Sequence, residues 1–390
     1  MNDRSLRSFL FVLGSALVLA TGAVFVESVW GDFAWDDHSL IVHNSRVRDP
    51  KFLPELLTSS FWKISSADAP GNPVYARLYR PVVSVAYLAQ FQLFGDSPEG
   101  FHVVSVILHM ICVCLVFAWL GLRIGEGRGE AAGRRGWIAA AFGAALFAFH
   151  PSRVESVAWV SGSTDLWMTL FVMLGLFAWR YRTRPIGLGL SAVAFTLAFF
   201  AKETAIVVPG LLVADGVLLH GLSLRNKGIR PYLGLFGILA VVLAFRLWVV
   251  PIFGGAPARQ GTIGVAVARI LSSLGHYVMH VLWPWIPSIH PTIRRTSPTT
   301  GEFLFDAHSL AIGAAVLVGL AVLILVARRW PRARPWLADS LWFVLPLLPV
   351  LNIADINTYS LTAYRFLYFP LIGVASMTTR CALAFIDRGP

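Results

Sequence analysis

The chain has 390 residues, of which 56% are hydrophobic and only 14% are charged, against roughly 25% charged in typical soluble domains. The net charge of +11 comes from arginines clustered in short loops between apolar runs. A basic face with interleaved stacking aromatics is lacking, which argues against a nucleic-acid partner. The composition therefore predicts a multi-pass helical membrane protein, with the lipid bilayer as its first partner.

Apolar runs long enough to cross about 30 Å of hydrocarbon recur along the chain. The first, about 8–30, follows Arg4 and Arg7 and is too long for a signal-peptide core, so we expect a retained anchor. The other expected spans are approximately 101–122, 136–149, 164–180, 186–200, 204–220, 231–250, 309–327, 336–352 and 362–380. Together with 80–95 and 266–286, they predict an all-α integral membrane protein of about 10–12 transmembrane helices, forming a single domain over 1–390.

The positive-inside rule orients these spans, because four short loops are rich in arginine and are expected to face the cytoplasm with the N-terminus. The basic loops contain Arg123/Arg128/Arg134/Arg135, Arg180/Arg182/Arg184, Arg225/Lys227/Arg230 and Arg328/Arg329/Arg332/Arg334. The first outer loop, 31–100, is long, and its stretches 50–62 and 80–95 are expected to form amphipathic helices on the membrane surface. An even number of crossings is required between 250 and 309, so 266–286 is expected to lie in the interface.

Ionisable residues gather on the outer side of the expected topology. Such groups are costly at membrane depth, and they tend to be functional. They come from five separate segments: Asp36, Asp37 and His38; Arg80; His150, Arg153, Glu155 and Asp165; Lys202 and Glu203; and Asp355, Tyr364 and Arg365. Topology alone predicts no such set of carboxylates and cations on one face.

Each of these residues also has a structural interpretation when it is taken singly. Asp36 and Asp37 could cap a helix, Lys202 and Glu203 could form a local ion pair, and an interfacial arginine could reach lipid headgroups. His276 and His280 could share a helix face as metal ligands, but no third ligand lies nearby in the sequence. The three cysteines suggest neither a disulfide framework nor a metal cluster, and no metal ligand is assigned.

A carboxylate facing a cationic cluster at the bilayer surface suits group transfer from a lipid phosphate. The carboxylate can act as general base on an acceptor hydroxyl, while the cations stabilise the departing phosphate. Partial desolvation raises the pKa of such a carboxylate and makes it a stronger base. A single base opposite the leaving group predicts one displacement, with inversion at the sugar carbon.

Several stretches of the sequence resemble a known family. "FAWDDHSLIVHN", "YRPVVSVAYLAQFQLFGDSPEGFHVVSVILHMICVCLVF", "ALFAFHPSRVESVAWVSGSTDLW", "AKETAIVVPG" and "YRFLYFPLIG" are similar to the membrane domain of transmembrane O-mannosyltransferases with tetratricopeptide repeats and to their bacterial relatives. That resemblance covers nearly the whole chain in order. It implies a GT-C-like fold, a polyprenyl-phosphate sugar as donor substrate, and a hydroxyl acceptor on protein Ser/Thr. No tetratricopeptide repeat is present in these residues.

The resemblance also implies roles for the outer-face residues. An acidic motif in the first outer loop supplies the catalytic base, which is Asp36 or Asp37, with Asp36 favoured. Arg80, Lys202 and Arg365 are candidates for the donor phosphate. Residues expected to line the substrate site are His38, His150, Arg153, Glu155, Asp165, Glu203 and Tyr364.

The expected location is a bacterial inner membrane, with the site facing the periplasm. The competing hypothesis is a transporter or flippase of a lipid-linked sugar, which would bind its cargo near the bilayer midplane and often carries internal repeats. No repeat is visible in the sequence. The identity of the sugar and any need for a divalent metal are left open.

Overall fold

The computed structural model of the protein describes residues 3–63, 78–126, 133–223, 227–250, 263–284, 294–296, 303–351 and 362–388. Across these ranges, six helices are long and apolar enough to cross a membrane, and three shorter helices are also apolar. The six candidate spans are Ser5–Trp30, Pro98–Gly125, Val160–Trp179, Arg230–Val249, Ile263–Leu282 and Ala307–Arg329. The prediction of an all-α multi-pass membrane protein is therefore confirmed.

The helices follow one another along the chain. The α-helices are α1 (Asp3–Phe25), α2 (Leu53–Thr58), α3 (Pro81–Phe94), α4 (Pro98–Glu126), α5 (Arg134–Phe149), α6 (Val154–Val157), α7 (Thr164–Trp179), α8 (Pro185–Ala201), α9 (Val208–Leu219), α10 (Arg230–Val249), α11 (Ile263–Leu282), α12 (Ala307–Arg329), α13 (Arg334–Leu347) and α14 (Leu371–Ile386). Short 3-10 segments used below are η1 (Val26–Trp30), η6 (Pro151–Arg153), η7 (Val160–Ser163), η8 (Glu203–Val207) and η12 (Tyr364–Leu367). One antiparallel pair joins β1 (Arg294–Thr296) to β2 (Phe303–Phe305), with Arg294 opposite Phe305.

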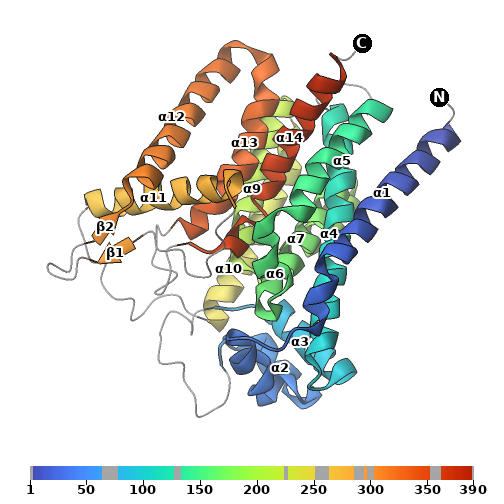
Figure 1. Ribbon diagram of the computed structural model, residues 1–390, viewed down its shortest axis with the longest axis vertical. Coiled ribbons are helices and arrows are strands. Elements are labelled where there is room, and N and C mark those ends of the chain that lie inside the picture. The colour runs from blue at the N-terminus through green and yellow to red at the C-terminus, as the bar shows by residue number, and fades with distance from the viewer. Residues whose placement is uncertain are drawn as a thin grey trace.

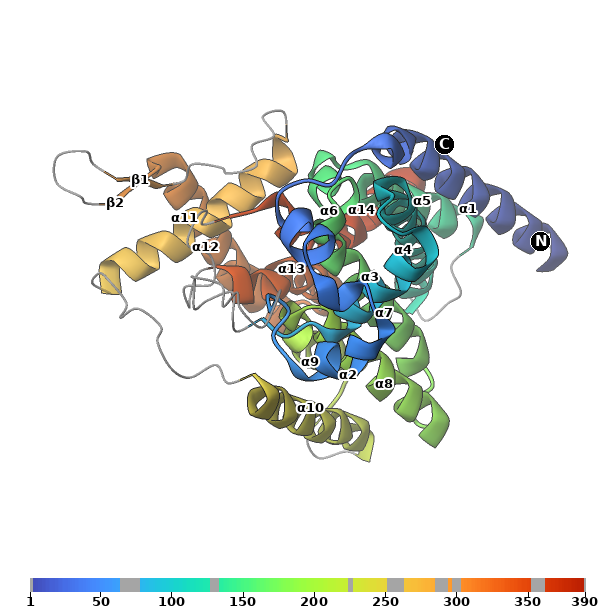
Figure 2. The same ribbon diagram turned by 90° about the horizontal axis from the view of Figure 1, so that it is seen from below.

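Figure 1 shows both chain termini at one end of the molecule and α2 and α3 at the other end. The α12–α13 connection, which carries several of the predicted cytoplasmic arginines, lies at the end with the termini. In Figures 1 and 2, α11 lies across the direction of α12 and α13. This transverse course fits the interfacial helix expected over 266–286, even though α11 is long and apolar enough to span.

Two predicted segments differ in extent from the helices. The helix expected over 50–62 begins as a 3-10 turn, Pro50–Phe52, that continues into α2 and ends at Thr58, and the backbone N–H of Phe61 then donates to the Leu78 carbonyl (2.7 Å). The last span begins at Leu371 rather than 362, because the backbone N–H of Arg365 donates to the Glu155 carboxylate (2.9 Å). Both departures tie irregular backbone to another segment of the chain.

Glycines allow helices to cross at very short distance, as is common in membrane bundles. A Cβ on Gly275 of α11 would lie 1.7 Å from the Ser309 carbonyl of α12, and one on Gly313 would lie 1.9 Å from the Leu271 carbonyl. At the α5–α14 crossing, a Cβ on Gly143 would lie 2.1 Å from the Thr379 hydroxyl. Only glycine fits these three positions as the helices are placed.

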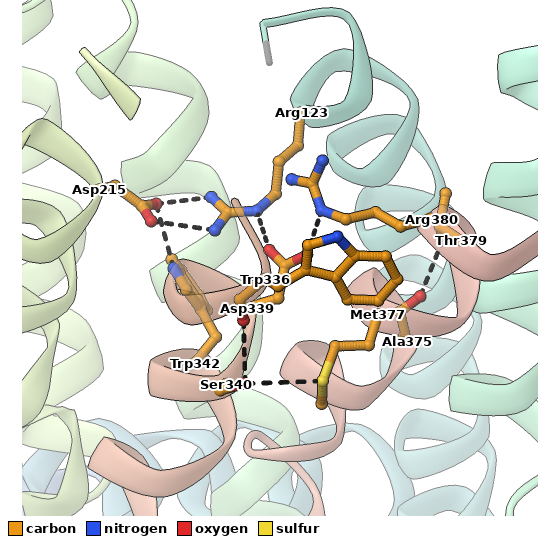
Figure 3. Close-up of polar contacts among 10 residues, drawn as sticks. All are labelled: Arg123, Asp215, Trp336, Asp339, Ser340, Trp342, Ala375, Met377, Thr379 and Arg380. Carbon is orange, nitrogen blue, oxygen red and sulfur yellow. Dashed lines mark hydrogen bonds and ion pairs between the residues drawn. The ribbon is translucent and has the colours of Figure 1, made fainter. Parts of the chain in front are cut away.

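A buried polar cluster joins four helices near the ends of α4 and α14 (Figure 3). Arg123 donates to Asp215 (Nη1–Oδ2, 2.6 Å) and to Asp339 (Nε–Oδ1, 2.9 Å). Arg380 binds the other oxygen of Asp339, and the Trp342 indole N–H donates to Asp215 (3.0 Å). The sequence placed Arg123 in a cytoplasmic loop, whereas the structure buries it in the last turn of α4.

Candidate active site

Asp37 anchors the loop that follows η1. Its carboxylate accepts the backbone N–H of Ala34 (3.0 Å) and, from a distant segment, both the backbone N–H (2.8 Å) and the hydroxyl of Ser161. The side chain is fully buried. Burial raises the pKa of Asp37, against the lowering effect of these hydrogen bonds. Asp37 therefore joins the first loop to η7, and its oxygens are occupied.

Asp36 is the half-buried neighbour of Asp37. Its carboxylate accepts no hydrogen bond from the part of the chain that the structure describes. Burial raises the pKa of Asp36, Arg365 and Arg80 oppose that rise, and the adjacent Asp37 adds to it. Of the two predicted bases, Asp36 is thus the one with oxygens available to a ligand.

The predicted cations and acids form ion pairs with one another. Arg80 lies 3.1 Å from Glu203, and Lys202 lies 2.5 Å from Asp165. A third pair, Arg365 with Glu155, is formed in the same way. Three acids that the sequence assigned to the substrate site are therefore the counter-ions of the three cations that it assigned to the donor phosphate.

These pairs differ in their access to a ligand. The side chains of Arg80 and Arg365 are 15% and 24% exposed, whereas that of Lys202 is only 3% exposed. Burial lowers the pKa of Lys202 to about 8, although Asp165 acts in the opposite direction. Burial acts to raise the pKa of Glu203, but the charges of Arg80 and Arg246 and the hydrogen bonds to the carboxylate together outweigh it, and the net shift is downward. Arg80 and Arg365 can therefore reach a bound anion directly, with Lys202 behind them.

Other predicted site residues hold the backbone in place. The fully buried Arg153 donates to the carbonyls of Leu367 (2.9 Å) and Tyr368 (2.8 Å), which positions η12 and with it Arg365. His150 contacts the Val281 carbonyl at the end of α11 through Nε2 (3.2 Å).

Burial lowers the pKa of His150 to about 4, with the Arg153 charge adding to the effect, so the imidazole is neutral at pH 7. Tyr364 is buried, and its ring centroid lies 4.3 Å from that of His280. His38 is not brought into this group, because it is exposed and stacks on His43. Asp355 lies outside the described residues.

No set of three or more His, Cys, Asp or Glu side chains is placed to hold a metal ion within the described ranges. His276 and His280 do share one face of α11, as their spacing predicts, and their Nε2 atoms contact each other.

A protein O-mannosyl-transferase of Caenorhabditis elegans is 24% identical over 396 residues, which cover 98% of this chain and 52% of the relative. Protein O-mannosyl-transferase TMTC4 of Homo sapiens is 29% identical over 226 residues, which cover 54% of this chain and 29% of the relative. Protein O-mannosyl-transferase Tmtc1 of Drosophila melanogaster is 28% identical over 186 residues, covering 47% and 20%. The chain resembles protein O-mannosyl-transferases.

The resemblance has a defined extent. The chain spans about half the length of the Caenorhabditis elegans protein O-mannosyl-transferase and less of the others. No family model matches the sequence. No solved structure matches it either. The identities to the three protein O-mannosyl-transferases confirm the resemblance that the sequence motifs indicated.

Sequence inspection missed residues that the structure places at this site. Arg246 is buried in α10, and its charge acts on both Glu203 and Arg80. A single arginine inside the apolar run "LAFRLWVV" is the signal that could have pointed to it, because charges within spans are rare. Ser161, which holds Asp37, gave no signal, since a serine in a polar turn is common.

Proposed function

We propose that this protein transfers a sugar, with mannose as the first candidate, from a polyprenyl-phosphate donor to a Ser or Thr hydroxyl of a protein. The observation that carries the proposal is Asp36, a carboxylate without a hydrogen-bond partner in the described chain, in the electrostatic field of Arg365 and Arg80. The names of the similar protein O-mannosyl-transferases support both the sugar and the protein acceptor. The GT-C-like fold and the polyprenyl-phosphate donor belong to this proposal.

The chemistry follows from the separate positions of base and cations. Asp36 takes the proton of the acceptor hydroxyl while the oxygen of that hydroxyl forms a bond to the anomeric carbon of the donor sugar. The bond between that carbon and the phosphate oxygen breaks, and the phosphate keeps the electron pair. Arg80 and Arg365 stabilise the charge that develops on the leaving phosphate. Attack from the side opposite the phosphate inverts the anomeric centre.

The carboxylate partners prepare these cations for that task. Glu203 and Glu155 each fix one long, flexible arginine side chain before a ligand arrives. A preset geometry reduces the ordering cost when the charged transition state forms. Lys202, held by Asp165, adds positive charge from behind without direct contact to solvent.

We infer that the site faces away from the cytoplasm. It includes the start of α3, which lies toward the end of the bundle opposite the termini, and the arginine-rich α12–α13 connection lies with the termini. In a bacterial inner membrane this side is the periplasm, and in an endoplasmic reticulum it is the lumen. A donor lipid could keep its tail in the bilayer there while its headgroup enters the site.

The proposal is tested with purified protein and radiolabelled polyprenyl-phosphate monosaccharides. We expect release of free polyprenyl phosphate and labelling of a Ser/Thr peptide by the wild type. Asp36→Asn should reduce the rate by about 10²–10⁴, the usual contribution of a general base. Asp32→Asn, an exposed carboxylate in the same loop, is the matched control and should be fully active. Donor binding without release in the wild type would instead support a carrier of lipid-linked sugars.

A further inference from the structure

Trp35, the residue before Asp36, has an unusual backbone. Its φ is +46°, and no other non-glycine residue in the described chain has a positive φ. The Asp37 N–H donates to the Ala34 carbonyl (3.0 Å), so Trp35 is the first central residue of a tight turn. Glycine usually takes this place, because a side chain strains the backbone at positive φ. Such strain persists where the surroundings enforce it, and it is concentrated at functional sites.

The Trp35 indole is also poorly covered for so large an apolar ring. It is 57% exposed, and its only ring contact in the described chain is edge to face with Trp159, at 5.8 Å between centroids. Trp159 is fixed in turn, because its indole N–H donates to the Ala34 carbonyl (3.2 Å). The turn and Trp159 therefore hold an aromatic face open at a strained position.

This aromatic pair adjoins both the proposed base, which follows Trp35 in the chain, and a proposed phosphate-binding cation, which contacts Trp159. The Arg365 guanidinium lies over the Trp159 ring, 5.1 Å from its centroid, and the Arg365 charge acts on Asp36. A sugar whose phosphate contacts Arg365 and whose anomeric carbon lies near Asp36 would therefore be bound next to this aromatic pair. We propose that Trp35, supported by Trp159, is the stacking platform for the pyranose ring of the donor.

The chemistry of hexoses fits such a platform. Pyranoses of the gluco or manno configuration carry the axial C3–H and C5–H on one face, and these groups are weakly electropositive. The face of an indole ring is electronegative, so the two surfaces are complementary. Stacking leaves the hydroxyls at the ring edge free and orients the anomeric carbon. This inference rests on the proposed function and names the residue that recognises the sugar part of the donor.

The test compares binding of polyprenyl-phosphate mannose with binding of polyprenyl phosphate that lacks a sugar, using the full chain in nanodiscs. Trp35→Gly removes the ring but accepts the positive φ, so we expect folding to be retained. It should weaken binding of the sugar lipid at least tenfold and change binding of the bare lipid less than twofold. Trp35→Phe keeps an aromatic face and should recover most of the loss. Trp30→Ala, which removes an exposed tryptophan at the end of η1, is the matched control and should change neither value.

Two results would contradict the proposal that Trp35 stacks on the donor sugar. Equal weakening of both lipids by Trp35→Gly would assign Trp35 to anchoring in the membrane interface. Unchanged binding of both lipids would show that the ring contacts no donor. In either case, sugar transfer by the wild type would leave the proposed function standing. If the wild type bound no polyprenyl-phosphate sugar at all, the proposed function would fail, and this inference with it.

Discussion

The Arg80 guanidinium and the Glu203 carboxylate lie 3.1 Å apart, although 123 residues separate them in the chain. Both Nε and Nη2 of Arg80 donate to one oxygen of Glu203, and the backbone N–H of Tyr79 donates to the other (3.3 Å). A single carboxylate thus fixes the start of α3 against the turn between α8 and α9. It also holds Arg80 where its charge acts on Asp36.

The two adjacent aspartates should separate into one that supports folding and one that supports chemistry. Asp37→Asn replaces one of the two buried acceptor oxygens with an NH2 donor, so at least one of the three hydrogen bonds is lost, and we expect the free energy of unfolding to fall by roughly 1–3 kcal/mol. Asp36→Asn removes an oxygen that no described group uses, and it should leave the unfolding temperature unchanged. Thermal unfolding in detergent measures both, and equal destabilisation by the two variants would contradict the assignment.

The pH dependence of transfer should report Asp36. The base works only when it is deprotonated, so activity falls as the pH falls through its pKa. Because burial raises the pKa of Asp36, the acid limb should lie above the ordinary aspartate pKa of about 3.9. Arg365→Gln removes the largest lowering influence and should move this limb to higher pH. The measurement is kcat/KM between pH 4 and 8, with the exposed-pair variant Arg48→Gln as control. If the acid limb stays at the same pH in Arg365→Gln, the charge of Arg365 does not act on the base.

The cluster of Figure 3 should contribute strongly to stability. Asp339 is fully buried and binds both Arg123 and Arg380. Asp339→Asn leaves the partly buried Arg380 without this carboxylate and the buried Arg123 with Asp215 alone. Removing one partner from a buried ion pair typically costs roughly 3–5 kcal/mol. Asp96→Asn, in an exposed ion pair with Arg48, should cost less than about 1 kcal/mol. Unfolding curves in one detergent would compare the two, and similar midpoints would contradict the prediction.

The crossing of α11 and α12 depends on glycine. Gly275→Ala and Gly313→Ala each place a methyl group against a backbone carbonyl, at 1.7 and 1.9 Å, so the helices must move apart. We expect a loss of roughly 1–3 kcal/mol for each. Gly319→Ala, in the same helix α12, meets nothing within 4 Å and should be neutral or slightly stabilising. Thermal unfolding of the three variants under the same conditions measures these effects, and a loss in Gly319→Ala equal to the other two would show that the losses do not come from the α11–α12 crossing.

The sequence predicted the helices well, because an apolar run of about 20 residues has few alternatives in a membrane. For example, a helix was predicted over 136–149, and the structure places α5 at Arg134–Phe149. The sequence failed where backbone hydrogen bonds leave the helix for distant partners. The contact from Arg365 to Glu155 delays the start of α14, and no local pattern in the sequence encodes it.

The candidate site was predicted as a set of residues but not as a set of pairs. Charge and topology indicated that Lys202 and Glu203 belong on the outer face, and adjacency suggested that they pair with each other. The structure instead pairs Lys202 with Asp165 and Glu203 with Arg80, because neighbouring residues at a helix end point in different directions. Pairing between segments far apart in sequence is set by packing, so a single sequence cannot supply it.

The paired state of the arginines has a consequence for selectivity. A site at the bilayer surface is surrounded by phospholipid headgroups, each of which carries a phosphate. Two bare guanidinium groups would attract these abundant lipids without distinction. Since Glu203 and Glu155 already satisfy Arg80 and Arg365, a phosphate alone gains little by entering. Only a lipid that makes further contacts with the protein can compete with the two carboxylates for the arginines. We therefore expect ordinary phospholipids to bind weakly at this site.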